Sequence, residues 1–292
     1  MKWKQRGATI VFLSILACVI TFCTSRAPSS YWLVLYAFSN EGQLLHSRMT
    51  ATQDITWAGR QISVGYLEGV PVVLAGSGIG TTNAAISLQY ILDHYPVCGV
   101  LFTGICGGIS ERNKIGDIVI PDHWVTHDYG YIGPEGFAPD SIYLGRARTD
   151  GFRPALTMPV DSQLFDWVCQ AAYAAAEDFK PVVDRIVQIY CGGVGATGNQ
   201  FIDQVEKRQW LAETFDAEIV DMESAAVLQT ALANGVPCVI IRSASDLAGG
   251  SGSATATTEI REFFQIAADN SAAVVTSFFR MLQEREFEVP ER

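Results

Sequence analysis

The chain has 292 residues, of which 49% are apolar and 17% charged, and its formal net charge at pH 7 is −11. The apolar share supports a large buried core and excludes a disordered chain. The acidic balance argues against nucleic acid or an anionic membrane as a partner, because both call for a basic face, whereas a neutral or cationic small ligand is compatible with it.

The first residues have the pattern of an export signal. Lys2, Lys4 and Arg6 precede an uncharged apolar run from Ala8 to Cys23, which is shorter than the ~20 residues that a membrane-spanning helix needs. We therefore predict that residues 1–30 are a leader with a short tether and that the protein is exported. No linker divides the rest, so residues 31–292 are predicted to form one domain.

Two processing routes for the leader remain open. Ile15-Leu16-Ala17-Cys18 loosely matches a bacterial lipoprotein cleavage site, which would leave a lipid anchor on Cys18. Ser25-Arg26-Ala27 resembles an ordinary signal-peptidase site, which would release the protein into the periplasm.

From Tyr31 onward, short β-rich runs alternate with helix-period segments, which is typical of an α/β sheet. The predicted strands are Trp32–Phe38, Ile62–Leu67, Val70–Ala75, Val97–Thr103, Asp117–Thr126, Val182–Gly193, Ala217–Val220 and Val236–Ala244. The predicted helices are Thr81–His94, Asp161–Glu177, Gln200–Thr214, Ser224–Asn234 and Thr258–Glu286. The stretch His127–Pro159, rich in Gly, Pro, Tyr and Asp, is predicted to be a functional loop or an insertion.

The cysteines carry no obvious chemistry. Five follow the leader, an odd number without tight spacing, so we predict neither a disulfide framework nor a zinc site. Most lie in apolar runs and are expected to be small buried core residues, namely Cys98, Cys106, Cys169, Cys191 and Cys238. We expect no metal and no cofactor.

Acids follow three of the apolar strands: Glu41, Glu223 and Asp246. Active sites in such sheets gather just past the carboxyl ends of strands. A single acid there is more often a helix cap or a solvated loop residue. The shared placement of three acids nevertheless favours a site.

The segments that carry these acids resemble a known family. V-D-M-E-S-A-A (Val220–Ala226) and G-V-P-C-V-I-I-R-S-A-S-D (Gly235–Asp246) are similar to the ribose and base signature of 5'-methylthioadenosine/S-adenosylhomocysteine nucleosidases. A-G-S-G-I-G (Ala75–Gly80), T-G-I-C-G-G (Thr103–Gly108) and I-G-D-I-V-I-P (Ile115–Pro121) occur in the family's order. The resemblance implies the nucleoside phosphorylase-like fold, a three-layer α/β/α architecture around a central mixed sheet.

The resemblance also implies roles for individual residues. Glu41 would position the attacking water, Glu223 would bind the ribose hydroxyls, and Asp246 would address N7 of the purine. Further substrate-binding positions are Met222 against the sugar, Phe201 and Ile202 at the base, Arg242 beside the ribose carboxylate and the water, Ser77 and Gly78 at the ribose and water site, and Cys106 in the glycine-rich segment.

Hydrolysis of C1'–N9 passes through an oxocarbenium-like sugar, which explains the need for these acids. Asp246 must protonate the leaving base while Glu41 accepts a proton from water. For Asp246 to donate near neutrality, a desolvated pocket must raise its pKa. We expect Phe201, Ile202 and Met222 to exclude water there.

Phosphate-using relatives carry one arginine in an early loop and another three residues before a serine. Here the early loop reads Ala37–Glu41 without arginine, and Phe102 and Ile105 stand at the second pair of positions. Water is therefore the expected nucleophile, because a phosphate dianion needs guanidinium partners in a dry site. Departures from the nucleosidases at Ser39, Asn40, Ile105 and Ile260 leave the identity of the substrate open.

Two alternatives stay open: a purine nucleoside phosphorylase of the same fold, and a non-catalytic nucleoside-binding or storage homologue. Retention of three acids disfavours the second. A dinucleotide site is excluded, because Gly76–Gly80 lacks the G-x-G-x-x-G spacing. The resemblance further implies a homodimer, for which the apolar composition leaves enough surface.

Overall fold

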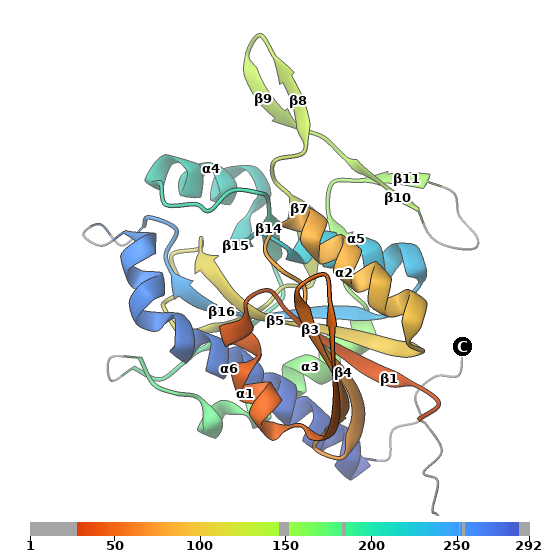
Figure 1. Cartoon of the computed structure of the whole chain (residues 1–292). Helices are drawn as coiled ribbons and strands as arrows, with labels where there is room; N and C mark the ends of the chain where they lie inside the picture. The colour runs from red at the N-terminus through yellow and green to blue at the C-terminus, as the bar shows by residue number, and fades with distance from the viewer. Residues whose placement is uncertain (1–27, 146–151, 183–184, 251, 253–254, 286–292) are drawn as a thin grey trace, which may run out of the picture.

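A computed structural model describes residues 28–145, 152–182, 185–250, 252 and 255–285 (Figure 1). The predicted leader, with Cys18, lies outside these residues. No helix of the described chain has the length and apolar character needed to cross a bilayer.

Twelve strands of the described residues form one mixed sheet, in which β5 is central. Along its length β5 pairs in parallel with β1 and β16, and at its end it pairs antiparallel with β15. The sheet contains β1 (Tyr31–Tyr36), β2 (Thr50–Trp57), β3 (Arg60–Leu67), β4 (Val70–Gly76), β5 (Val97–Gly108), β6 (Ile118–Ile120), β7 (His123–Thr126), β12 (Met158–Pro159), β13 (Ile189–Cys191), β14 (Val194–Thr197), β15 (Ala217–Asp221) and β16 (Cys238–Asp246).

Helices cover both faces of the sheet (Figure 1). On one side lie α1 (Ser39–Arg48), α3 (Ser162–Ala174) and α6 (Ala256–Arg285), and on the other α2 (Thr81–His94) and α5 (Ser224–Asn234). Helix α4 (Val205–Phe215) packs on β14 and β15, and a 3-10 turn spans Ala176–Asp178. This arrangement confirms the predicted three-layer fold with a mixed sheet.

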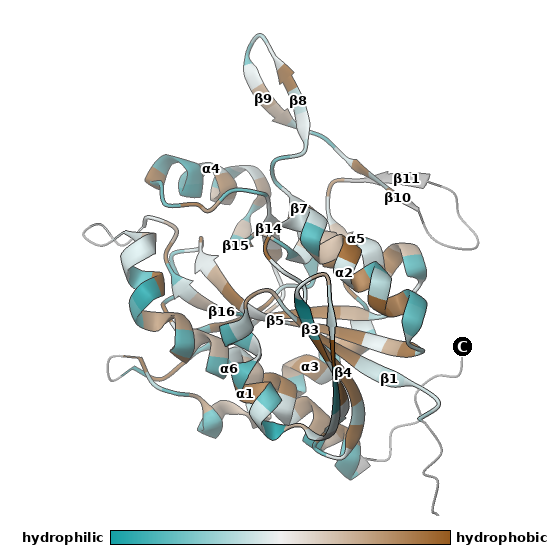
Figure 2. Ribbon diagram, in the orientation of Figure 1, coloured by the Kyte–Doolittle hydropathy of each residue, from teal (hydrophilic) through white to brown (hydrophobic). Residues whose placement is uncertain are grey.

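The sheet is apolar along most of its central strands, as Figure 2 shows. In β1 and β5 nearly every residue is buried, as is the centre of β4, which is expected of strands that are covered on both faces. Trp32 packs edge-to-face on Phe278 of α6, with ring centroids 5.1 Å apart. The long helix α6 is thereby fixed beneath the strands that carry the candidate site.

The stretch His127–Pro159 contains two hairpins and β12. β8 (Gly130–Gly133) pairs with β9 (Gly136–Pro139), and β10 (Ile142–Gly145) pairs with β11 (Phe152–Ala155). The hairpin β8–β9 projects from the body of the molecule (Figure 1).

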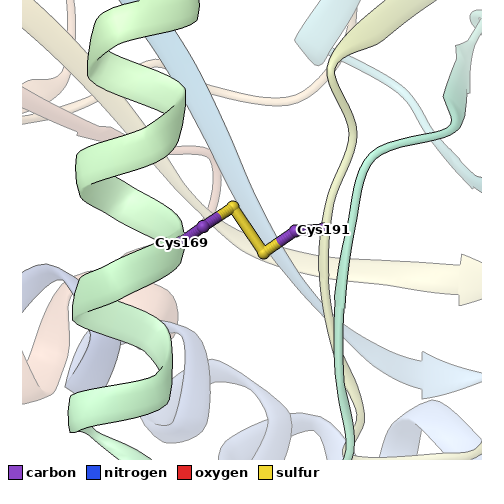
Figure 3. Close-up of a disulfide and its surroundings, with 2 residues drawn as sticks. All are labelled: Cys169 and Cys191. Atoms are coloured by element: carbon purple, nitrogen blue, oxygen red, sulfur yellow. A yellow bond between two sulfur atoms is a disulfide. The ribbon is translucent and has the colours of Figure 1, made fainter.

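One expectation about the cysteines was wrong. Cys169 of α3 and Cys191 at the end of β13 form a disulfide, with Cα atoms 6.2 Å apart (Figure 3). The 22-residue separation gave no spacing signal, because the two residues are brought together only when α3 packs beside β13. Cys106 and Cys238 are free and buried, as predicted, whereas Cys98 is only partly buried and donates to the Tyr31 carbonyl.

Candidate active site

Glu41 lies in the first turn of α1, and its carboxylate faces inward. Its Oε2 accepts hydrogen bonds from the backbone N–H groups of Ala37 (2.7 Å) and Phe38 (2.8 Å), and its Oε1 accepts from Ile105 (2.8 Å). Burial raises the pKa of Glu41, while Arg242 and these three donors oppose the rise. The carboxylate is thus fixed against β5.

Arg242 of β16 is fully buried and makes an ion pair with Asp221 at the end of β15. Its Nε donates to Oδ2 of Asp221 at 2.9 Å, and its Nη2 donates to the hydroxyl of Ser224 at 2.8 Å. Thr197 donates to Oδ1 of Asp221 at 2.5 Å. The carboxylate of Asp221 is therefore paired with Arg242 and is not available to bind a substrate.

Glu223 lies between β15 and α5 and is directed toward the start of α2. Its Oε1 accepts from the backbone N–H of Gly80 at 2.7 Å. Burial, and next the charge of Asp221, raise the pKa of Glu223 to about 7. Glu223, which was predicted to bind the ribose hydroxyls, thus lies beside the loop that precedes α2.

Asp246 ends β16 and is only 2% exposed. Its Oδ1 accepts from the backbone N–H of Ala248, and its Oδ2 accepts from the hydroxyl of Ser245, both at 2.9 Å. Burial raises the pKa of Asp246 to about 7 against these hydrogen bonds, with small contributions from Glu259 and Asp203. Near neutrality a large fraction of Asp246 is therefore protonated.

The glycine-rich end of β5 runs between these groups. Gly104 pairs with Arg242 and Gly107 with Asp246, and a side chain at Gly104 would overlap both Arg242 and Glu41. Three strand residues span about 10 Å. The end of the site with Glu41 and Arg242 is thus separated from the end with Asp246 by a length that a purine nucleoside can occupy.

Phe102 stands at the position where phosphate-using relatives carry an arginine, and its role differs from that of the arginine. Its buried ring lies under the guanidinium of Arg242, 4.1 Å from the centroid to Cζ. Such a cation–π contact favours the charged arginine in a dry environment. The described site thus holds four acids and one arginine that is already paired.

An apolar cluster adjoins Glu41. Ile105 packs with Ile260 and Phe264 of α6, and Phe264 lies edge-to-face on Phe38 with centroids 5.6 Å apart. The side chain of Phe38 is 36% exposed. This cluster provides an apolar wall beside the proposed water position.

The other predicted substrate residues differ in their placement. Ile202 is buried in a second core cluster with Ala248, whereas Phe201, on the loop between β14 and α4, is 49% exposed. Met222, partly buried, sits between Asp221 and Glu223. Burial raises the pKa of the Cys106 thiol well above its usual range.

Ser77 and Gly78 support the site indirectly. The Ser77 hydroxyl donates to the Gly78 carbonyl at 3.0 Å, and it is Gly80 that contacts Glu223. Arg60 of β3 donates to the Ser77 carbonyl at 2.9 Å and to Asn83 at 2.6 Å. Sequence reasoning missed Arg60, Gly80 and Asp221, and only Asp221, two residues before Glu223, had a local signal.

Among the residues that the structure describes, no group of three or more His, Cys, Asp or Glu side chains has an arrangement that could hold a metal ion. A model of the phosphorylase superfamily matches residues 34–280. The chain belongs to the phosphorylase superfamily.

Two relatives within the phosphorylase superfamily carry the same name. The 5'-methylthioadenosine/S-adenosylhomocysteine nucleosidase of Geobacillus kaustophilus strain HTA426 is 31% identical over 257 residues, which are 87% of this chain and 98% of that protein. Its counterpart from Geobacillus thermodenitrificans strain NG80-2 is 30% identical over 86% of this chain and 97% of that protein.

A solved structure to which this chain is similar carries the same name as these two relatives. The nucleosidase of the same name from Neisseria meningitidis, in complex with methylthio-immucillin-A, has a TM-score of 0.70 and 27% sequence identity. The similarity covers 87% of this chain and all of that one.

Proposed function

We propose that this protein hydrolyses the N-glycosidic bond of a purine nucleoside of the methylthioadenosine or adenosylhomocysteine type, releasing adenine and a ribose derivative. One observation carries the proposal: Glu41 and Asp246 lie along the end of β5, and Glu223 is near enough to interact with the charges of Glu41 and Arg242, the latter bound to Asp221. The names of the relatives support the same reaction.

In this mechanism each acid acts at a different part of the substrate. Asp246 donates a proton toward N7 of the base, so that C1'–N9 breaks with a neutral leaving group. Glu223 accepts hydrogen bonds from the ribose hydroxyls and holds the cationic sugar. Glu41 accepts a proton from the water that attacks C1'.

Water is the nucleophile in this proposal. A phosphate dianion would enter beside Glu41, Asp221 and Glu223, where the charge of Arg242 is already neutralised by its ion pair with Asp221 and its Nε and Nη2 are bound to Asp221 and Ser224. Placing an anion among buried carboxylates without an added cation is strongly unfavourable.

The apolar wall of Phe38, Ile105, Ile260 and Phe264 supports a substrate with an apolar 5' substituent. An alkylthio group buries its surface there, at about 25 cal/mol per Å². An unmodified hydroxymethyl group would meet no polar partner in this cluster.

A base-release assay in phosphate-free buffer tests the proposal. We expect free adenine from methylthioadenosine, with a rate that added phosphate does not raise; the panel also includes adenosylhomocysteine, adenosine, deoxyadenosine and inosine. Release that depends on phosphate would establish the phosphorylase alternative. Binding without release from any of the nucleosides would establish a binding or storage protein.

We further propose that the protein is a homodimer. A groove of about 540 Å³ between the start of α2, α5 and β10 is bordered by Tyr129 and Tyr143, which are 46% and 61% exposed. Exposed aromatic side chains around a groove are typical of interfaces. Light scattering at micromolar protein should give twice the chain mass, and Tyr143→Lys should halve it. Tyr173→Lys, also at a residue that is 61% exposed, is the control.

We also propose that the protein is exported. It is then either anchored by a lipid on Cys18 or released into the periplasm after cleavage near Ala27. The disulfide Cys169–Cys191 supports it independently of the leader, because disulfides persist in oxidising compartments and are rare in the cytosol. Fractionation of the native host with mass spectrometry of the N-terminus distinguishes the two routes. An unmodified Met1 in the soluble cytoplasm would refute both.

A further inference from the structure

A second cavity, of about 640 Å³, lies between the hairpin β8–β9 and α4. Neither Glu41, Glu223 nor Asp246 lines it, so it is separate from the candidate active site. Its volume lies within the range of about 300–1,000 Å³ that is common for small-molecule sites.

His127 lines this cavity and has no accessible surface. Neither ring nitrogen of His127 has a hydrogen-bond partner within the described part of the chain. The ring lies directly on Gly198, where a side chain would overlap Nε2. Burial lowers the pKa of His127, so the neutral ring offers one donor and one acceptor. Unpaired buried groups of this kind are rare and require an explanation.

The rest of the lining is aromatic and amide in character. Trp210 of α4 and Phe137 of β9 lie edge-to-face, with centroids 6.0 Å apart, and join the two walls. Gln200 and Gln204 supply side-chain amides. Gln204 is the N-cap residue of α4, yet its side chain makes no capping hydrogen bond.

The charges of the lining disfavour an anion. Lys207 lies with its Nζ 3.6 Å from the centroid of the Trp210 ring, and it is balanced by Asp128 and Glu206. The lining therefore carries one positive and two negative charges. A neutral ligand with a flat face for the aromatic rings and adjacent donor and acceptor atoms for the imidazole and amides fits this set.

We propose that this cavity, here called the His127 pocket, is a second ligand site that binds a neutral, planar nitrogen heterocycle of the purine-base class. Gln200 and Gln204 line the pocket, whereas the base-binding candidates Phe201 and Ile202, which lie between them in the sequence, do not. The choice of a purine base as the ligand rests on the proposed function, because the base is the product of that reaction. The cavity and its unpaired histidine do not depend on the proposed function.

Isothermal titration of the full-length protein with adenine tests the inference. We expect two sites per chain. His127→Phe, which removes both ring nitrogens, and Gln204→Ala should each weaken one site at least tenfold and leave the other unchanged. Glu213→Ala, on the same helix and outside the lining, is the control and should change neither.

The outcomes separate the second site from the proposed reaction when base release is measured on the same samples. A single adenine site, or two sites that Gln204→Ala and His127→Phe leave unaltered, would overturn the second site even if the protein releases adenine. Two sites with the expected sensitivity would support it even if no base is released. If His127→Phe does not fold, Gln204→Ala alone decides.

Discussion

The guanidinium of Arg242 is bound to Asp221 and not to Glu223. Nε donates at 2.9 Å and Nη2 lies 2.8 Å from the same carboxylate oxygen, and both residues are buried. The resemblance to nucleosidases predicted that Arg242 would steady the ribose carboxylate and the water. The charge of Arg242 lowers the pKa of Glu223, whereas the charge of Asp221 raises it.

Removal of Asp221 should therefore destabilise the protein as well as the reaction. Asp221→Ala leaves Arg242 buried without its partner, which typically costs about 3–5 kcal/mol in the free energy of unfolding. Urea unfolding monitored by circular dichroism measures the loss. Arg112→Ala, which breaks the half-exposed pair with Glu218, is the control and should cost less than about 1 kcal/mol. Equal losses in the two variants would contradict this account of the pair.

Gly104 should tolerate no side chain. An alanine methyl group would overlap Oε1 of Glu41 and Nη1 of Arg242, two groups that the proposed mechanism needs in place. Displacement of catalytic groups by about 1 Å costs on the order of 10²-fold in rate. We expect kcat for base release from methylthioadenosine to fall by at least that factor in Gly104→Ala.

The control for this variant is Gly235→Ala. Gly235 ends α5 in the left-handed region, with φ of 65°, and has open space around it. Alanine there should lower the free energy of unfolding by about 1 kcal/mol without a change in kcat. Full activity of Gly104→Ala would show that Glu41 and Arg242 do not act together at this position.

The raised pKa values of two carboxyl groups predict a pH dependence of activity. The pKa of Glu223 and that of Asp246 are both about 7. Activity should rise as Glu223 ionises and fall as Asp246 loses its proton, giving a bell-shaped profile of kcat/KM centred near neutrality. Asp246→Asn should lower kcat/KM by about 10²–10⁴-fold and remove the alkaline limb. A variant with the wild-type rate would exclude Asp246 as the acid.

The same groups predict a pH dependence of stability. In the unfolded chain both ionise near pH 4. Between about pH 4 and pH 7 the folded protein binds more protons than the unfolded chain, so the free energy of unfolding decreases as pH rises. Each group contributes up to about 1.4 kcal/mol per pH unit. In urea titrations from pH 4.5 to 8, Asp246→Asn should flatten this slope, and identical slopes would argue against a buried proton on Asp246.

Local signals explain which elements could be predicted from sequence. Helices α2 and α5 have the predicted bounds because Gly80 precedes the first and Gly235 follows the second. Helix α1 was missed because Ser39–Arg48 is mostly polar and contains Gly42, and its turn is held by contacts of Glu41 with the backbone. β2 was missed because it is an edge strand with few apolar residues.

The candidate site was predictable to the extent that its residues follow strands. Glu41, Glu223 and Asp246 do, and the sheet brings them to one edge. The partner of Arg242 lies 21 residues away, and the contact of Gly80 with Glu223 spans 143 residues, so neither had a signal in a single sequence. The tertiary fold brings the hydrogen-bond donors to each acid, and it also provides the burial that raises the pKa of each acid.

The disulfide carries the last prediction. Cys169 and Cys191 close a loop of 22 residues that joins α3 to β13, and β13 pairs with β6, the neighbour of the strand that bears Arg242 and Asp246. Loop-closure entropy for this length gives about 3 kcal/mol of stabilisation. Cys169→Ser should therefore lower Tm by several degrees, and dithiothreitol should lower the Tm of the wild type equally while leaving that of Cys169→Ser unchanged.

Cys98→Ser serves as the matched control, because Cys98 is a partly buried cysteine of the same sheet outside the Cys169–Cys191 bond, and this variant should retain the response to dithiothreitol. Peptide mapping without reductant should recover the segments with Cys169 and Cys191 as one linked species when the protein is isolated from the compartment in which it functions. If that native material contains both residues as free thiols, the stabilising role and the support that the disulfide gives to export fail together, whereas a linked species with an unchanged Tm on reduction would contradict the stabilising role alone.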